Sequence, residues 1–270
     1  MSCLLGRGLL LAMLSAGLLT TAQAGPTLVK IPTPRGVTQS FILITPERPV
    51  ASVILFAGED GALGLESASS MKRLAETFLV RTRNSFADHH FAVAVVDTPS
   101  DRPEGMSAVF RMSDAHADDI DAVAAYLKKQ AAVPVWLVGT SMGTFSAAGG
   151  AIAAKDIDGL VLTSTITHSA SAWAIAKSHA DGVASMALAK VAGPTLIVSH
   201  RKDACEISPP AGAPKHQGRL VNAAKVEVAV LDGGDRPQSG PCEPKSAHGF
   251  FGIEAKAVDT IAKFIGANSK

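Results

Sequence analysis

A serine lies between two glycines in Gly139-Thr140-Ser141-Met142-Gly143, a spacing that could make its hydroxyl a nucleophile. The apolar run 133–138 precedes this motif, and an alanine-rich segment follows it. A sharp turn from strand to helix would lift Ser141 out of the sheet, and small flanking residues would prevent clashes there. We therefore predict that Ser141 is a nucleophile; the alternative is an ordinary glycine-rich turn with an N-capping serine.

The elements around this turn alternate between short apolar runs and helical segments. Apolar runs indicate strands that are buried on both faces, and parallel neighbours need crossover helices between them. We predict one domain over 25–270, a doubly wound, mostly parallel sheet with helices on both faces. Ligands then bind beyond the carboxyl ends of the strands. Expected strands are 40–45, 51–56, 91–96, 133–138, 159–163, 195–199 and 225–231, and expected helices are 70–80, 113–130, 144–154, 214–222 and 253–265.

With this strand–turn–helix context, Gly139-Thr140-Ser141-Met142-Gly143 resembles the nucleophile motif of the α/β-hydrolase superfamily. The resemblance covers nearly the whole of 25–270 and is greatest to small bacterial esterases and dienelactone-hydrolase-like members. It implies catalytic residues in the order serine, acid, histidine along the chain.

The resemblance places the acid after a late strand and the histidine in the loop before the last helix. The matching positions are Asp203, in His200-Arg201-Lys202-Asp203, and His248, in Ser246-Ala247-His248-Gly249-Phe250. Asp203 would orient His248, the general base. Surface roles are the alternative for both residues, and Asp232 and Asp235 are the other candidate acids.

Two backbone amides are expected to bind the oxyanion in such a site. Met142 follows the nucleophile and supplies one. The other is implied at Glu59, because Ala57-Gly58-Glu59 aligns with the superfamily's His-Gly-x signature, with alanine in place of histidine. The Glu59 and Asp60 carboxylates are expected to point away from the oxyanion, which they would oppose.

Two cysteines remain beyond the N-terminal segment, Cys205 and Cys242. In an oxidising compartment they can form a disulfide, and free thiols are the alternative. The bridge would tie the loop of the acid to the loop of the histidine. The sequence has no CxxC or HExxH motif, so neither a metal nor another cofactor is predicted.

The N-terminal segment and the composition bear on location and partners. A basic start, an apolar run and Ala22-Gln23-Ala24 predict a signal peptide over 1–24, and hence a periplasmic or secreted protein without a stable membrane anchor. The alternative is an uncleaved anchor. Charged residues make up 18% of the chain and the formal net charge is +1, which gives no reason to expect nucleic acid as a partner. The oligomeric state cannot be read from the sequence.

These residues together predict hydrolysis of a small-molecule carboxylic ester through an acyl-enzyme intermediate. An amidase or peptidase would use the same three residues, a binding protein could keep the fold without turnover, and a redox protein could use Cys205 and Cys242. The segment 165–191, where the resemblance places a lid, is short. Its Trp173 and Met186 either shape an acyl pocket or pack on the surface.

Overall fold

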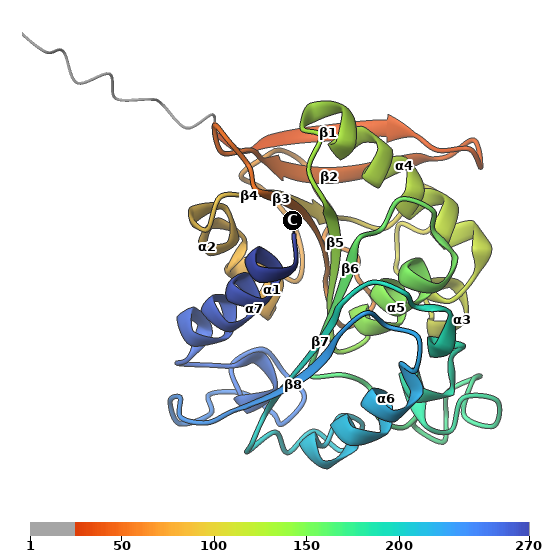
Figure 1. The fold of residues 1–270 in the computed structure, drawn as a ribbon, viewed down its shortest axis with the longest axis vertical. Helices are drawn as coiled ribbons and strands as arrows, with labels where there is room; N and C mark the ends of the chain where they lie inside the picture. The colour runs from red at the N-terminus through yellow and green to blue at the C-terminus, as the bar shows by residue number, and fades with distance from the viewer. Residues whose placement is uncertain (1–24, 270) are drawn as a thin grey trace, which may run out of the picture.

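An eight-stranded sheet runs through the centre of the computed structural model, which describes residues 25–269 (Figure 1). The strand order is β1-β2-β4-β3-β5-β6-β7-β8, in which β1 and β2 are antiparallel to their neighbours and the others are parallel. The predicted signal peptide over 1–24 lies outside the described residues. The strands are β1 (Thr27–Pro32), β2 (Thr38–Ile44), β3 (Ala51–Phe56), β4 (Phe91–Val96), β5 (Val135–Thr140), β6 (Gly159–Thr163), β7 (Thr195–His200) and β8 (Val226–Leu231).

The central strands are buried on both faces, as their apolar runs predict. In β3, Val53 and Leu55 belong to one hydrophobic core, while Ile54 and Phe56 belong to the other. Since successive side chains of a strand point to opposite faces, one apolar run can supply two cores. The prediction of a doubly wound, mostly parallel sheet is confirmed.

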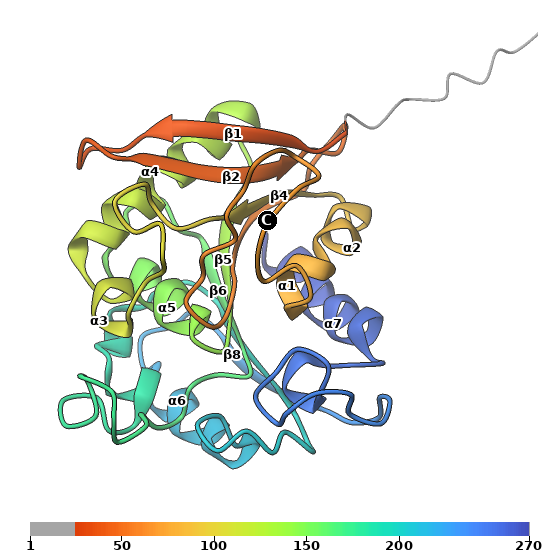
Figure 2. The ribbon, with the colours of Figure 1, turned by 180° about the vertical axis from the view of Figure 1, so that it is seen from behind.

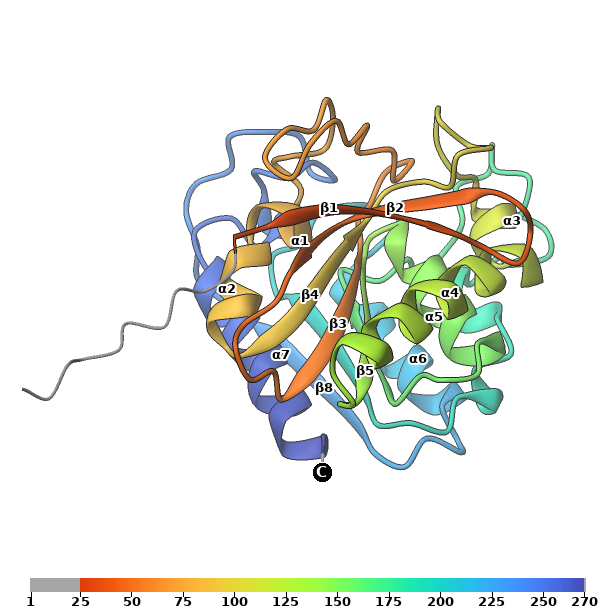
Figure 3. The same ribbon diagram turned by 90° about the horizontal axis from the view of Figure 1, so that it is seen from above.

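Helices cover the sheet in two layers (Figures 2 and 3). One layer holds α1 (Phe78–Arg81), α2 (Arg83–Asp88) and α7 (Glu254–Asn268), and the other holds α3 (Ala108–Arg111), α4 (Asp114–Gln130), α5 (Gly143–Ala153) and α6 (Ala213–Arg219). Among residues 25–269, no helix combines the length and apolar character needed to cross a bilayer.

The longest helix, α4, begins and packs as its sequence predicts. The Ser113 hydroxyl accepts a hydrogen bond from the His116 amide at 3.3 Å, which caps the first turn. Ile120, Val123 and Leu127 are buried along one face of the helix. This face packs on the same core as α5, the helix that follows the nucleophile turn.

The predicted helix over 70–80 is wrong. Only α1, at the end of that range, is helical, and the residues before it form turns. Met71 instead bridges to Leu65, and the Lys72 amide donates to the carbonyl of Leu63 at 3.0 Å. Leu74 then takes a positive φ of 58°, which a continuing helix does not allow. Backbone contacts with the loop after β3 therefore override the local helical pattern.

Candidate active site

Ser141 occupies the turn between β5 and α5 and has a positive φ of 51°. Its amide donates to the carbonyl of Thr163 at 3.1 Å, which fixes the turn to the neighbouring strand. A Cβ atom on Gly139 would collide with the carbonyl oxygen of Gly143, and a Cβ on Gly143 with that of Phe56. The two glycines are thus needed for the tight strand-to-helix turn that the sequence motif predicts.

Asp203 and His248, the predicted acid and base, lie in contact. The Nδ1 atom of His248 is 3.0 Å from Oδ2 of Asp203, and both side chains are buried. Asp203 follows β7, and its Oδ1 accepts a hydrogen bond from the amide of Cys205 at 2.9 Å. An ionised carboxylate only accepts hydrogen bonds, so a neutral His248 bound to it through Nδ1 would hold its proton there and keep a lone pair on Nε2.

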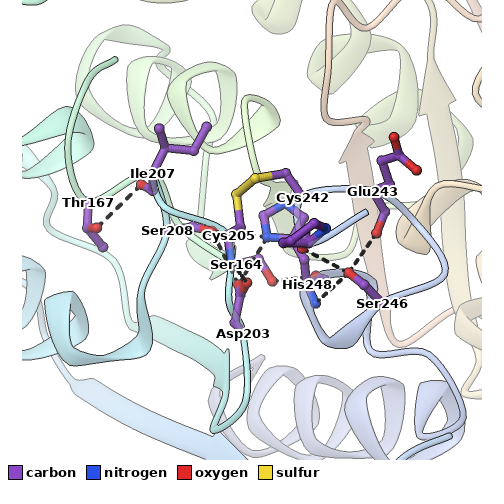
Figure 4. The surroundings of a disulfide bond; sticks show 11 residues. Ser164, Thr167, Asp203, Cys205, Ile207, Ser208, Cys242, Glu243, Ser246 and His248 are labelled. Carbon is purple, nitrogen blue, oxygen red and sulfur yellow. Dashed lines mark hydrogen bonds and ion pairs between the residues drawn. A yellow bond between two sulfur atoms is a disulfide. The ribbon is translucent and has the colours of Figure 1, made fainter. Parts of the chain in front are cut away.

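The backbone of His248 is held by two serine hydroxyls. Ser246 Oγ accepts from the His248 amide at 3.2 Å, and Ser164 Oγ donates to the His248 carbonyl at 2.7 Å (Figure 4). The Nε2 atom is buried and has no hydrogen-bond partner among residues 25–269. His248 and Ser141 line the same cavity, but no hydrogen bond joins Nε2 to the Ser141 hydroxyl among these residues.

Ser208 is a site residue that the sequence analysis missed. Its buried Oγ donates to Asp203 Oδ2 at 3.2 Å and lies 3.0 Å from His248 Nδ1. The hydroxyl therefore contacts both partners of the acid–base pair. Nothing in the local sequence indicates this role, because Ser208 comes near His248 only through the path of the loop after β7.

A disulfide joins Cys205 to Cys242, as predicted (Figure 4). Cys205 lies two residues after Asp203, and its own amide bonds that carboxylate. Cys242 lies in the loop that carries His248 and lines the cavity next to Ser141. The bridge thus ties together the two loops that carry Asp203 and His248, the predicted acid and base.

The predicted oxyanion donors lie in two segments that meet at Ser141. Met142 directly precedes α5, and Glu59 follows β3 with a positive φ of 50°. A Cβ built on Gly58 would lie 3.1 Å from Cβ of Ser141, so the Glu59 loop passes close to the nucleophile turn. Neither the Met142 nor the Glu59 amide donates a hydrogen bond to any other residue within 25–269.

Arg111 is a second residue that the sequence analysis missed. Its side chain hydrogen-bonds the backbone of the Glu59 loop. Its guanidinium donates to the Glu59 carbonyl at 3.1 Å and to Ser146 Oγ on α5 at 2.9 Å. The side chain is fully buried, and this burial lowers the pKa of Arg111 to about 10, against the opposing effect of Asp60. The guanidinium therefore links the Glu59 loop to the helix that begins at the nucleophile turn.

The two carboxylates of this loop have different environments. Asp60 bonds the Ala62 amide through Oδ1 at 3.0 Å and pairs with Arg73 through Oδ2, so it is engaged within its own loop. Glu59 is exposed at the edge of the cavity. Partial burial, followed by the charges of Asp60 and Glu243, raises the pKa of the Glu59 carboxyl, whereas Arg73 lowers it.

Comparison with solved structures identifies the architecture. Over 91% of this chain and 92% of the other, the structure superposes on an esterase from Pyrococcus furiosus with a TM-score of 0.65 and 14% sequence identity. A cold-adapted esterase from an Arctic intertidal metagenomic library matches over 93% of this chain and all of its own, with a TM-score of 0.57 and 14% identity. The chain has the α/β-hydrolase fold.

A third matching structure is a puromycin-hydrolyzing peptidase from Mycobacterium tuberculosis. It matches over 90% of this chain and 40% of its own, with a TM-score of 0.62 and 15% identity. No family model matches the sequence, and no curated relative was found. At these identities the likeness concerns the fold, which confirms the resemblance inferred from the sequence.

Two cavities open beside the nucleophile turn of this α/β-hydrolase fold. The first has a volume of about 30 Å³ and is lined by Ser141, His248, Cys242 and Glu59 together with part of α1. The second has a volume of about 330 Å³, and Met142 forms one of its walls. No cluster of three or more histidine, cysteine, aspartate or glutamate side chains suited to a metal ion occurs within residues 25–269.

The other candidate acids lie away from His248. Asp232 is exposed and pairs with Arg201 at 3.1 Å. Asp235 is exposed in the loop after β8, where its amide donates to the Phe251 carbonyl. His200, near Asp203 in sequence, is buried and lies 3.1 Å from the carbonyl of Gly233 through Nε2. Of the candidate acids, Asp203 is the one that the fold brings to His248.

Proposed function

We propose that this protein is a serine hydrolase that cleaves small carboxylic esters through an acyl-enzyme intermediate. The observation that carries the proposal is the buried 3.0 Å contact between His248 Nδ1 and Asp203 Oδ2, beside a cavity that His248 lines together with Ser141. Esterases are among the solved structures with this fold, which adds support at the level of architecture.

The first half of the reaction forms the acyl-enzyme. His248 Nε2 accepts the hydroxyl proton of Ser141 while Oγ attacks the ester carbonyl carbon. Asp203 stabilises the imidazolium and keeps the ring in the tautomer that has an Nε2 lone pair. When the tetrahedral intermediate collapses, the bond to the alcohol oxygen breaks and Nε2 returns the proton to that oxygen.

The second half releases the acid. Water attacks the acyl carbon as His248 takes its proton, and Ser141 leaves with that proton as the carboxylic acid is formed. In both halves the negative charge on the carbonyl oxygen would rest on the Met142 and Glu59 amides. Preformed amide donors stabilise such charge because they need no reorganisation during the reaction.

Labelling with a fluorophosphonate probe tests the proposal directly. The mature protein is expected to be labelled and to hydrolyse p-nitrophenyl acetate, and Ser141→Ala is expected to lose both properties. Ser69→Ala is a matched control, because Ser69 is exposed on the loop before α1. If the folded wild-type protein is neither labelled nor active, the proposed reaction is wrong.

Paired substrates separate ester from amide hydrolysis. We expect a higher kcat/KM for an ester than for the amide with the same acyl group. The opposite order would favour the amidase or peptidase alternative. Ligand binding of equal strength by wild type and Ser141→Ala, without turnover, would instead favour a binding protein.

We also propose that the protein acts outside the cytoplasm. The Cys205–Cys242 disulfide supports this, because such bonds persist in oxidising compartments. Cell fractionation and N-terminal sequencing of the mature protein test it, and we expect a first residue of Gly25.

A further inference from the structure

The 330 Å³ cavity beside Met142 has an apolar lining. Its walls are the start of α3, the side chain of Met142 and the segment after β6; they comprise Ser107, Ala108, Val109, Met142, Ala172, Trp173, Ala174 and Ile175. Ser107 and the indole N–H of Trp173 are the polar groups among these side chains, and the Ser107 hydroxyl already accepts a hydrogen bond from the Phe110 amide at 3.3 Å. No charged side chain lines the cavity, so a charged group would gain no ionic partner there and the lining favours neutral apolar groups.

The cavity lies beside the nucleophile turn, next to the start of α3. Met142 is shared between the cavity wall and the nucleophile turn, and its amide is one of the proposed oxyanion donors. The cavity wall includes the start of α3, whereas the small cavity of Ser141 and His248 is lined by part of α1. The helices α3 and α1 lie in opposite layers (Figure 3). The sheet separates these two layers, and Ser141 lies at the end of the central strand β5 between them.

The position of His248 decides which part of an ester each cavity can take. The leaving alcohol receives its proton from His248 Nε2, so it must lie on the histidine side. The acyl chain then extends from the carbonyl carbon to the other side, past Met142. The histidine side has a cavity of about 30 Å³, so of these two cavities the one beside Met142 has the greater room for a bulky apolar group.

We infer that the cavity beside Met142 binds the acyl chain of the substrate, and that the substrates are esters of neutral apolar acids with a small alcohol part. This inference rests on the proposed esterase function. It assigns Val109 and Trp173 to acyl recognition. Val109 is 54% exposed, so its side chain is accessible to a ligand.

An acyl-chain series of p-nitrophenyl esters, from acetate to decanoate, tests the inference. For wild type, kcat/KM is expected to rise by up to roughly fourfold per methylene until the cavity is filled. Val109→Asp places a charge in the wall and should lower the octanoate-to-acetate ratio of kcat/KM at least tenfold. Ala174→Trp, which fills the cavity by bulk alone, should lower the same ratio.

Val221→Asp is the matched control, because Val221 is 70% exposed in the turn after α6, and we expect it to keep the wild-type ratio. Acetate esters of alcohols of increasing length form the second series, which should not distinguish Val109→Asp from wild type. If the alcohol series responds instead, the acyl assignment is wrong. An unchanged ratio in both cavity variants also overturns it.

The labelling experiment separates this inference from the proposed function. A wild-type protein that is labelled and hydrolyses acetate, but shows no acyl-length preference, retains the esterase function and loses the acyl cavity. A protein that is not labelled loses both. Circular dichroism and thermal unfolding verify that each variant is folded before its ratio is compared.

Discussion

Arg111 donates a hydrogen bond to the carbonyl oxygen of Glu59 from a fully buried position. The Glu59 carbonyl is thereby fixed, and with it the backbone of a residue that has a positive φ of 50° and whose amide is a proposed oxyanion donor. Because the same guanidinium bonds Ser146 on α5, the two proposed oxyanion donors have a common support. Arg111 is thus a positioning residue.

Replacement of Arg111 should affect kcat more than KM. In Arg111→Met the Glu59 loop loses its support, and we expect kcat to fall by roughly 10²-fold, the magnitude seen when one oxyanion donor is lost. Steady-state kinetics on p-nitrophenyl acetate measure this. Arg236→Met, on the exposed loop after β8, serves as the control. A change confined to KM would contradict the role, and Arg111→Lys should recover part of the loss because it keeps a donor.

Glu59→Gln should speed the reaction at neutral pH. The variant keeps the backbone amide but removes a carboxylate from the edge of the site, so we expect kcat/KM to rise roughly twofold to threefold at low salt and less at high salt. Burial raises the pKa of this carboxyl from 4.5. As the pH falls through that raised pKa, the wild-type carboxyl becomes neutral and the difference between the two proteins should vanish. A gain that persists at the lowest pH would rule out charge as its cause.

The same pKa shift has a defined effect on stability. A carboxyl with a raised pKa in the folded protein holds its proton more tightly there than in the unfolded chain. Its contribution to the free energy of unfolding is present below pH 4.5 and is lost as the pH rises through the folded pKa. Urea unfolding at several pH values should show this decline in wild type and not in Glu59→Gln. Parallel pH profiles for the two proteins would show that Glu59 has no such effect.

Ser208→Ala should lower kcat by roughly tenfold. The substitution leaves the buried Asp203 Oδ2 with one hydrogen bond fewer and removes a contact to the His248 ring. Ser208→Thr keeps the hydroxyl and should retain most of the activity. Equal losses in the two variants would mean that packing, rather than the hydroxyl, matters at this position.

Removal of the disulfide should cost both stability and activity. The cysteines are 37 residues apart, and the chain-entropy relation gives a stabilisation of about 4 kcal/mol for a loop of this length. Urea unfolding of Cys205→Ser/Cys242→Ser against wild type measures it, and a reductant should lower the stability of wild type alone. We expect kcat to fall as well, because the Asp203 and His248 loops lose their covalent link. Unchanged kcat in the double variant would mean that the hydrogen bonds alone position the pair.

Much of this fold could be predicted because its strands are apolar on both faces. The runs that became β3, β4 and β6 were predicted with their observed bounds, since continuous burial leaves little ambiguity in a short β-branched segment. The prediction of a helix over 70–80 is wrong because the local sequence does not determine the backbone conformation there. That conformation is set by contacts with Leu63 and Leu65, which are invisible to a local pattern.

The residues of the candidate site likewise include some that the sequence predicts and some that it does not. Ser141 lies in a motif whose glycines are required by the tight strand-to-helix turn. Asp203 and His248 occupy positions that follow from the order of the catalytic residues along the chain. Ser208 and Arg111 have no motif, because their roles arise where separate loops meet in the folded protein. The loop from Asp232 to Ala247 was similarly unpredictable, since its path depends on the bridge at Cys242.

The edge strand β8 lies between the two cysteines in the chain and is the last strand of the sheet. It is only partly buried, and Val230 is 42% exposed. An edge strand of this kind is expected to detach transiently from its neighbour, a motion that native-state hydrogen exchange detects. The disulfide between Cys205 and Cys242 joins the two ends of the chain segment that contains β8. Such an opening therefore stays local. The edge of the sheet can open transiently while His248 and Asp203 remain in contact.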